Sequence, residues 1–583
     1  MPTASTDSLL AVDIGNIYTR VALLDIAGGE FRFVASGQAR TTIELPFNDM
    51  GEGVRQALDQ LSEVTGRRFL DESEHFIIPS QADGSGADSL VATSSAGEAL
   101  RVAIVGLMPN VSVATAQKVA GSNYLKVVEV LSLGDRRREE QQIDSFLAAK
   151  PDILIIAGGT EHGSKSAVLR LVDTAIMAIR LMPQNKRPEV LYSGNRDIRA
   201  DVKKRFEGLC EVTEAENMRP ELDRENIDPA RRQLSTIYEH VRIGRIAGYS
   251  EIARWGGSVL PTAQAQGFVV NYLNRLHKSD NGALGIDIGS SATSLAASFR
   301  GRMSLMTRPD IGVGHNAVNV LHYTTLDRLT RWLPREVSPN AMRDYIYNKS
   351  LAPASVPQEL DDLYLEHALA RECLQITLAS ALPIYPASVK GSGPSLTPYF
   401  DNILIDGAVL TLAPKPGQAA LIVLDGLQPC GVTNLILDTY NLAPALGVVS
   451  ALNPTATVQI MESGSFMNLG TAISLVGEAR AGQEVARIKV EPKNGEKIDL
   501  KIQFGTLQVI PLPADQEAKV NIQPYSGFDA GFGAGTSKTI TVKGGAVGLI
   551  IDARGRPIVF PKQPAKRYEA VKKWCNVLGE YET

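Results

Sequence analysis

Cysteine is scarce in this chain of 583 residues, which holds only Cys210, Cys373, Cys430 and Cys575. They stand far apart and form no CxxC pair, so the sequence carries no zinc signature and fits a reducing cytoplasm. The seven histidines are equally dispersed, and none lies in an HExxH pattern. We therefore expect a cytoplasmic protein without a structural metal cluster.

Long apolar runs and an excess of basic residues are also missing. No stretch of about 18 apolar residues indicates a membrane span, and the polar start of the chain does not resemble a signal peptide. The 59 Lys and Arg residues against 64 Asp and Glu give a net charge of −5 without a long basic run. This balance excludes the electrostatic footprint of a nucleic-acid-binding protein. The length indicates roughly three or four domains.

One motif occurs twice. Residues 10–22, LAVDIGNIYTRVA, return as residues 284–296, LGIDIGSSATSLA. Each copy is typical of an apolar strand, a tight Asp-x-Gly turn and a second apolar strand. Glycine in such a turn accepts a positive φ and lets the backbone approach a ligand. Free N–H groups then hold phosphate oxygens, and the aspartate holds hydrated Mg²⁺. We predict that Asp13 and Asp287 face each other across one cleft as metal-binding and catalytic residues.

Residues 100–205 have a different sequence pattern. Short apolar segments at 102–105, 127–131, 153–156 and 190–192 alternate with segments of helical periodicity. Strands that alternate with helices predict a parallel, doubly wound sheet. Glycine-bearing turns follow two of these strands, where ligands of parallel sheets often bind. The plainer alternative is a tight strand-to-helix turn, with Asp197 as a helix cap.

The remaining regions complete a four-part layout. Residues 1–99 and 206–282 are predicted to form one half of a duplicated core, interrupted by the inserted parallel α/β subdomain 100–205. Residues 283–480 form the other half. Residues 481–583 alternate with period two and predict an antiparallel β-domain that ends in a helix.

Further motifs make the duplication more specific. Together with the paired hairpins, they resemble the actin/Hsp70/sugar-kinase superfamily and, within it, the glutamate mutase-associated MutL family. The resemblance covers roughly residues 9–480. Its blocks, in serial order, are residues 91–97, 100–109, 151–160, 192–197, 260–263 and 413–422.

The resemblance implies a duplicated α/β core with an actin-like, ribonuclease H-like ATPase fold that binds ATP and Mg²⁺. It also implies a reactivating chaperone that exchanges damaged cobalamin on an adenosylcobalamin-dependent mutase. The residues that it places at the nucleotide are Gly15, Asn16, Thr19, Arg20, Gly289, Ser290, Ser291, Thr293, Gly407 and Ala408.

Three positions depart from the superfamily pattern. Ser290 replaces the second glycine of the usual Asp-x-Gly-Gly, Ser294 stands where an acidic residue is expected, and the usual Gly-Gly reads Gly407-Ala408. A Cβ at position 290 hinders the close approach of a phosphate. The alternative to an ATPase is therefore a non-hydrolysing actin-like scaffold that assembles into homo-oligomers. A small-molecule kinase ranks third, because no catalytic aspartate stands out in a substrate pocket.

Overall fold

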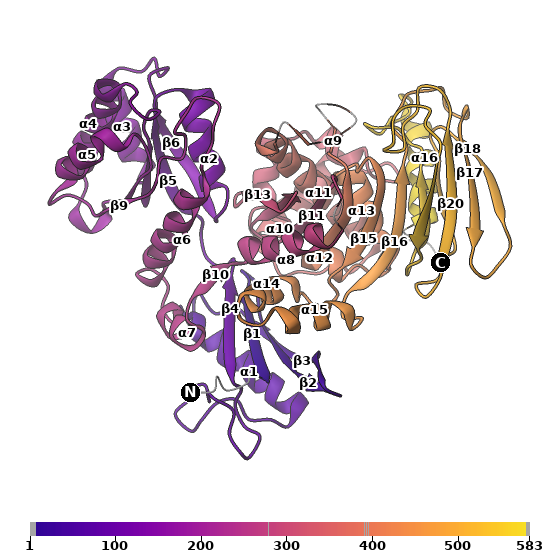
Figure 1. The fold of residues 1–583 in the computed structure, drawn as a ribbon, viewed down its shortest axis with the longest axis horizontal. Helices are drawn as coiled ribbons and strands as arrows, with labels where there is room; N and C mark the ends of the chain where they lie inside the picture. Colours follow the sequence, from indigo (N-terminus) through magenta and orange to yellow (C-terminus); the bar gives the residue numbers. More distant parts are fainter. Residues whose placement is uncertain are drawn as a thin grey trace.

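The computed structural model describes residues 7–277, 279–386, 388, 389, 391, 393 and 396–578. Two of its sheets follow one plan (Figure 1). In each, the first strand pairs antiparallel with the second and parallel with the fourth. The strands of the first sheet, in chain order, are β1 (Ser8–Ile14), β2 (Tyr18–Ala27), β3 (Glu30–Arg40), β4 (Ser89–Ser94) and β10 (Val259–Pro261). Their counterparts are β11 (Gly282–Ile288), β12 (Thr293–Phe299), β13 (Arg302–Arg308), β14 (Phe400–Asp406) and β15 (Gly431–Leu437).

The registers of the two hairpins also agree. Asp13 lies opposite Arg20 in one sheet, and Asp287 lies opposite Ser294 in the other. In the parallel direction the same two aspartates lie beside Thr93 and Asp406. The duplicated α/β core is thus confirmed, with equivalent aspartates at the ends of equivalent strands.

Helices cover both sheets and meet between them. In the first half α1 (Met50–Thr65) buries a stripe of apolar side chains spaced three or four residues apart, and Gly66 in the left-handed conformation ends it. The other helices of this half are α7 (Tyr249–Gly256) and α8 (Thr262–His277). The second half contains α9 (Leu326–Thr330), α10 (Pro339–Leu351), α11 (Leu360–Ala381), α12 (Ala408–Thr411), α13 (Pro416–Gly426), α14 (Ala443–Leu452) and α15 (Pro454–Glu462), with short 3₁₀ turns at Ala317–His322 and Leu382–Ile384.

Helices α8 and α14 cross at close range between the two halves. A Cβ on Gly447 of α14 would lie 1.9 Å from the carbonyl oxygen of Ala265 in α8. Only glycine permits this approach, so the halves are joined at a fixed crossing. Among the described residues, no helix has the length and apolarity that a membrane crossing requires.

The inserted region carries a parallel five-stranded sheet in the order β6-β5-β7-β8-β9. It extends beyond the expected end at residue 205, because β9 pairs with β8 and α6 packs on the sheet. Its elements are β5 (Leu100–Gly106), a π-helical turn (Pro109–Val113), α2 (Ala114–Ala120), β6 (Leu125–Leu131), α3 (Glu139–Ala149), β7 (Ile153–Ala157), α4 (Lys165–Leu181), a 3₁₀ turn (Gln184–Lys186), β8 (Glu189–Tyr192), a 3₁₀ turn (Arg196–Ile198), α5 (Arg199–Phe206), β9 (Val212–Glu214) and α6 (Asp228–Ile243).

The inserted region lies within the sequence of the first half and also touches the second half. The backbone N–H of Thr307 donates to the carbonyl of Gly121 at 3.0 Å. A guanidinium nitrogen of Arg231 donates to the carbonyl of Met303 at 3.3 Å. Both hydrogen bonds join the insertion to β13, so the insertion bridges the two halves.

The C-terminal antiparallel sheet is confirmed, but it is smaller than expected. It contains β17 (Glu484–Pro492), β18 (Ile498–Gln503), β20 (Glu517–Pro524) and β21 (Lys538–Lys543). Strands β19 (Leu507–Ile510) and β22 (Gly548–Asp552) instead extend the sheet of the second half beyond β16 (Met467–Ser474). The expectation that all of residues 481–583 stand apart is therefore wrong. Every residue of β22 is buried, and a strand buried on both faces belongs inside a sheet. Helix α16 (Pro564–Leu578) closes the chain against the second half.

Candidate functional site

A cleft of about 1330 Å³, partly open to solvent, lies between the two halves. Both aspartates of the repeated motif line it, as do the loops that follow them. The predicted residues on its walls are Asp13, Gly15, Asn16, Arg20, Asp287, Gly289, Ser290, Ser291, Gly407 and Ala408.

Thr19 and Thr293 were also predicted at the nucleotide, but they do not line the cleft. Both side chains are fully buried. The hydroxyl of Thr19 lies 3.0 Å from that of Thr41, and the hydroxyl of Thr293 donates to the carbonyl of Ile311 at 3.0 Å. Side chains alternate along a strand, so a residue next to one that faces the cleft points to the opposite side. The two threonines hold their strands in place.

The glycines of both hairpins close identical turns. The N–H of Gly15 donates to the carbonyl of Tyr18 at 2.9 Å, and that of Gly289 donates to the carbonyl of Ala292 at 2.8 Å. Neither glycine has a positive φ, contrary to the expectation from sequence. Each is needed for space instead, because a Cβ would lie 3.1 Å from the same carbonyl oxygen.

Asp13 is held by neutral donors. The hydroxyls of Thr93 and Thr262 donate to its Oδ1 at 2.7 and 3.0 Å. Burial raises the pKa of the Asp13 carboxyl, while the two threonines and the charge of Arg20 act in the opposite direction. The first aspartate thus has hydrogen bonds that favour its ionised form.

Asp287 has a different environment. Burial and the negative charge of Asp13 raise the pKa of its carboxyl, and Arg20 opposes them. Beside it in the sheet stands Asp406, whose own pKa is raised by burial and by the charges of Asp438 and Asp287. Three carboxyls, the buried Asp406 and the half-buried Asp13 and Asp287, therefore share the base of the cleft with Arg20. A divalent cation is the group that would relieve this repulsion.

The donor set fits a hydrated Mg²⁺ ion. Such an ion keeps several waters and needs only one or two carboxylates together with the phosphates of a substrate. Asp13 and Asp287 would supply those carboxylates. Among the described residues, no group of three or more His, Cys, Asp or Glu side chains forms a self-sufficient metal site.

The loop that follows β11 is braced by residues 313–315. The Ser290 hydroxyl lies 2.8 Å from Nδ1 of His315 and accepts its backbone N–H at 3.0 Å. The backbone N–H of Gly314 donates to the carbonyl of Ser290 at 2.9 Å. The Ser290 side chain is thus engaged with residues 313–315. Ser294, at the expected acidic position, is buried and contacts Thr307.

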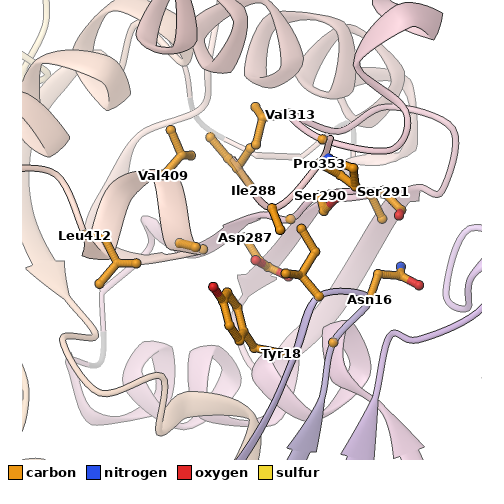
Figure 2. Close-up of a pocket in the computed structure, with 18 of the residues that line it drawn as sticks. Asn16, Tyr18, Asp287, Ile288, Ser290, Ser291, Val313, Pro353, Val409 and Leu412 are labelled. Atoms are coloured by element: carbon orange, nitrogen blue, oxygen red, sulfur yellow. The ribbon is translucent and has the colours of Figure 1, made fainter. Parts of the chain in front are cut away.

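The cleft has a polar end and an apolar end (Figure 2). Asn16, Ser290 and Ser291 lie on one side, and Val409 and Leu412 lie on the other. Gly407 also lines the cleft, with a φ of 99°. A Cβ there would lie 2.5 Å from backbone atoms of Ile288, so this close approach requires glycine. The apolar end suits a planar base, and the polar end suits phosphates.

Sequence reasoning missed several residues of this cleft. Asp406 and Thr93, which contacts Asp13 from behind the cleft wall, are brought to the aspartates by strand pairing, and Thr262 reaches Asp13 from the first residue of helix α8. Tyr124 comes from the inserted region, lines the cleft and accepts the N–H of Ala263 at 3.2 Å. Its pKa is raised well above the usual value, first by burial and then by the charge of Asp287.

The two equivalent hairpin sheets and the cleft between them define an actin-like ATPase fold. Residues 9–464 match the family described as MutL protein, and the chain belongs to that family. A curated relative, Protein MutL of Clostridium tetanomorphum, is 22% identical over 493 residues, which cover 78% of this chain and 98% of the relative.

The solved structures that match superpose only loosely on this chain. The ethanolamine utilization protein EutJ from Carboxydothermus hydrogenoformans is 9% identical with a TM-score of 0.28, over 77% of this chain and 90% of that one. Nucleotide-free acetone carboxylase is 11% identical with a TM-score of 0.30, over 85% and 81%. The sheets themselves, rather than these superpositions, define the fold.

Proposed function

We propose that this protein binds ATP with Mg²⁺ in the cleft between its halves. The observation that carries the proposal is that the aspartates of two equivalent hairpins line the same cleft. Asp13 and Asp287 would hold the hydrated ion, and Arg20 would contribute positive charge at the phosphates. The loop residues Gly15, Asn16, Gly289, Ser290 and Ser291 would surround the phosphates, and Gly407 and Ala408 would lie at the adenosine.

We further propose that the nucleotide controls binding to an adenosylcobalamin-dependent mutase, on which the protein acts as a reactivating chaperone. Membership of the MutL family supports this partner. A cleft between two halves is a two-state element, and a partner that prefers one state shifts the equilibrium between them. The insertion, which contacts both halves, offers the surface where such a shift would reach a partner.

A non-hydrolysing scaffold is the second candidate, and two observations favour it. Ser294 stands opposite Asp287 in the strand pair, and no carboxylate occupies that position. The Ser290 hydroxyl is engaged with His315. Both features predict nucleotide binding with slow or no hydrolysis, because the second loop lacks the acid that would assist the reaction.

Isothermal titration with ATP, with and without Mg²⁺, tests the binding proposal. We expect saturable binding that Mg²⁺ strengthens, and we expect Asp287→Asn to abolish most of the Mg²⁺ effect while leaving some affinity. Asp499→Asn, in an exposed ion pair of the C-terminal sheet, is the matched control and should bind like the unmodified protein. Absence of binding in the unmodified protein would overturn the proposal.

Turnover separates the two candidates. We expect little hydrolysis by the unmodified protein and measurable hydrolysis by the double variant Ser290→Gly with Ser294→Asp. Steady turnover by the unmodified protein, lost in Asp287→Asn, would instead favour the ATPase. The mutase role is tested separately, by adding the protein with ATP and intact cofactor to an inactivated mutase and measuring whether mutase activity returns.

A further inference from the structure

The geometry points to a second ligand site, within the inserted region. A pocket that is partly open to solvent lies at the carboxyl ends of its parallel strands, away from the nucleotide cleft. We propose that this pocket binds a small, neutral, aromatic heterocycle through an apolar slot and a hydrogen-bonding edge.

The sheet topology puts the pocket where ligands bind in this class of fold. The strand order β6-β5-β7-β8-β9 reverses direction between β5 and β7. In open parallel sheets of this order, ligands occupy the crevice outside the carboxyl ends of the two strands at the reversal. The pocket is lined by residues that directly follow β5, such as Leu107 and Met108, and β7, such as Gly159 and Thr160.

The walls are shaped by specific contacts. The Ser112 hydroxyl accepts the N–H of Met108 at 3.0 Å, which fixes the loop after β5. Residues after β9 form another wall of the pocket, next to those after β5 and β7. There the Asn217 amide donates to the carbonyl of Gly159 at 3.1 Å. Its Oδ1 accepts the N–H of Arg219 at 2.9 Å. The pocket is therefore held open by residues whose polar groups are already satisfied.

The lining selects an uncharged, largely apolar occupant. Leu107, Val111 and Met218 form the slot, and Met108 and Leu222 at its mouth are 51% and 64% exposed. Large apolar side chains left this accessible around a cavity are typical of a binding site. Methionine side chains adapt well to flat aromatic groups.

Charge on the lining is already neutralised. Among the described residues that line the pocket, Arg219 alone is charged, and its guanidinium donates to Glu225 at 2.7 Å and to the carbonyl of Leu222 at 2.7 and 3.1 Å. A phosphate or carboxylate would thus find no spare cation. The hydroxyls of Thr160 and Ser164 make no hydrogen bond within the described part of the chain, so they are available to the edge of a heterocycle.

Two probes with the same ring system test this proposal on the full chain. 2-Phenylbenzimidazole is neutral near pH 7.5, whereas its 5-sulfonate carries a negative charge. We expect saturable one-to-one binding of the neutral probe by fluorescence titration, and at least tenfold weaker binding of the sulfonate. Saturating ATP with Mg²⁺ should not displace the neutral probe, because the two sites are separate. Displacement by ATP, equal affinity for both probes, or no saturable binding would overturn the proposal.

Variants locate the probe in the pocket. Val111→Trp fills the slot and should weaken binding at least tenfold, whereas Leu133→Trp should leave it unchanged. Leu133 is 53% exposed in the loop after β6 and does not line the pocket. Thr160→Val keeps the shape and removes one hydroxyl, and we expect about fivefold weaker binding. Thermal melting shows that each variant is folded. Equal affinity of Val111→Trp and the unmodified chain would contradict the assignment.

Discussion

The two aspartates of the cleft occupy equivalent positions, yet their neighbours differ. Asp13 accepts hydrogen bonds from Thr93 and Thr262. At the position equivalent to Thr93, Asp287 has another carboxylate, Asp406. Opposite Asp13 stands Arg20, whereas Ser294 stands opposite Asp287. Duplication has kept the backbone and changed the charges. Burial raises the pKa of both carboxyls, but hydrogen bonds oppose that rise only in the first half, while in the second half the charge of Asp13 adds to it.

The halves also differ in size. The sheet of the first half ends after five strands, whereas that of the second continues through β16, β22 and β19. A buried ion network secures this extension. Its members are Arg371, Asp425, Asp552, Arg554 and Arg556.

The largest expected effect tests whether this extension is integral to the second half. Arg554 is fully buried, with guanidinium nitrogens 2.6 Å from Asp425 and 2.8 Å from Asp552. Arg554→Met removes one of the two arginines that each of these buried carboxylates contacts, since Arg371 and Arg556 remain, and we expect a loss of about 3–5 kcal/mol in the free energy of unfolding. Chemical denaturation measures it. Arg487→Met, in an exposed ion pair, is the control with a much smaller loss; equal losses would show that the network is dispensable.

The second prediction concerns the asymmetry of the aspartates. Because the folded-state pKa of Asp287 lies above its usual value of 3.8, the ligand-free protein loses stability as pH rises from about 4 toward that raised pKa. Asp287→Asn removes this pH-dependent loss. We therefore expect the free energy of unfolding to rise by about 1–3 kcal/mol at pH 8 and to vary less with pH. Melting temperatures between pH 4.5 and 8 measure both. Asp13→Asn should gain less, since it removes a carboxylate already held by two donors. A larger gain from Asp13→Asn would reverse the comparison.

The third prediction concerns a variant in which the first half resembles the second. Arg20→Ser copies the Ser294 environment and removes the cation nearest the aspartates. We expect about tenfold weaker binding of ATP, measured by titration calorimetry. Arg20→Lys keeps the charge and loses the planar guanidinium, so its affinity for ATP should lie between that of the unmodified protein and that of Arg20→Ser. Unchanged affinity in Arg20→Ser would exclude a role for this side chain at the phosphates.

The smallest expected effect lies at the mouth of the cleft. His315, which braces the second loop, has its Nε2 3.8 Å from a carboxylate oxygen of Glu44 in the first half. Glu44 is largely exposed, and exposed pairs contribute little. We expect Glu44→Gln to change ATP affinity less than about twofold. A tenfold change would mean that this contact, rather than the aspartates, controls closure.

Local patterns in the sequence were enough to predict the duplicated hairpins. An Asp-x-Gly turn between two apolar strands is defined within 13 residues, so the two aspartates could be identified without coordinates. Their neighbours could not, because Asp406 stands more than a hundred residues from Asp287 and meets it only through strand pairing. Thr19 and Thr293 were misplaced although strand alternation alone puts them on the opposite face. The continuous apolar stretch in β22 was a further overlooked signal, since it is typical of a strand in the interior of a sheet.

The bridge made by the insertion constrains any movement of the cleft. The insertion is joined to the first half at both of its ends, hydrogen-bonds β13 of the second half through Gly121 and Arg231, and places Tyr124 against the cleft. Hinge motion between the halves must therefore tilt the insertion or break these bonds. A small movement at the aspartates would thus be transmitted through the insertion to the outer surface of its parallel sheet.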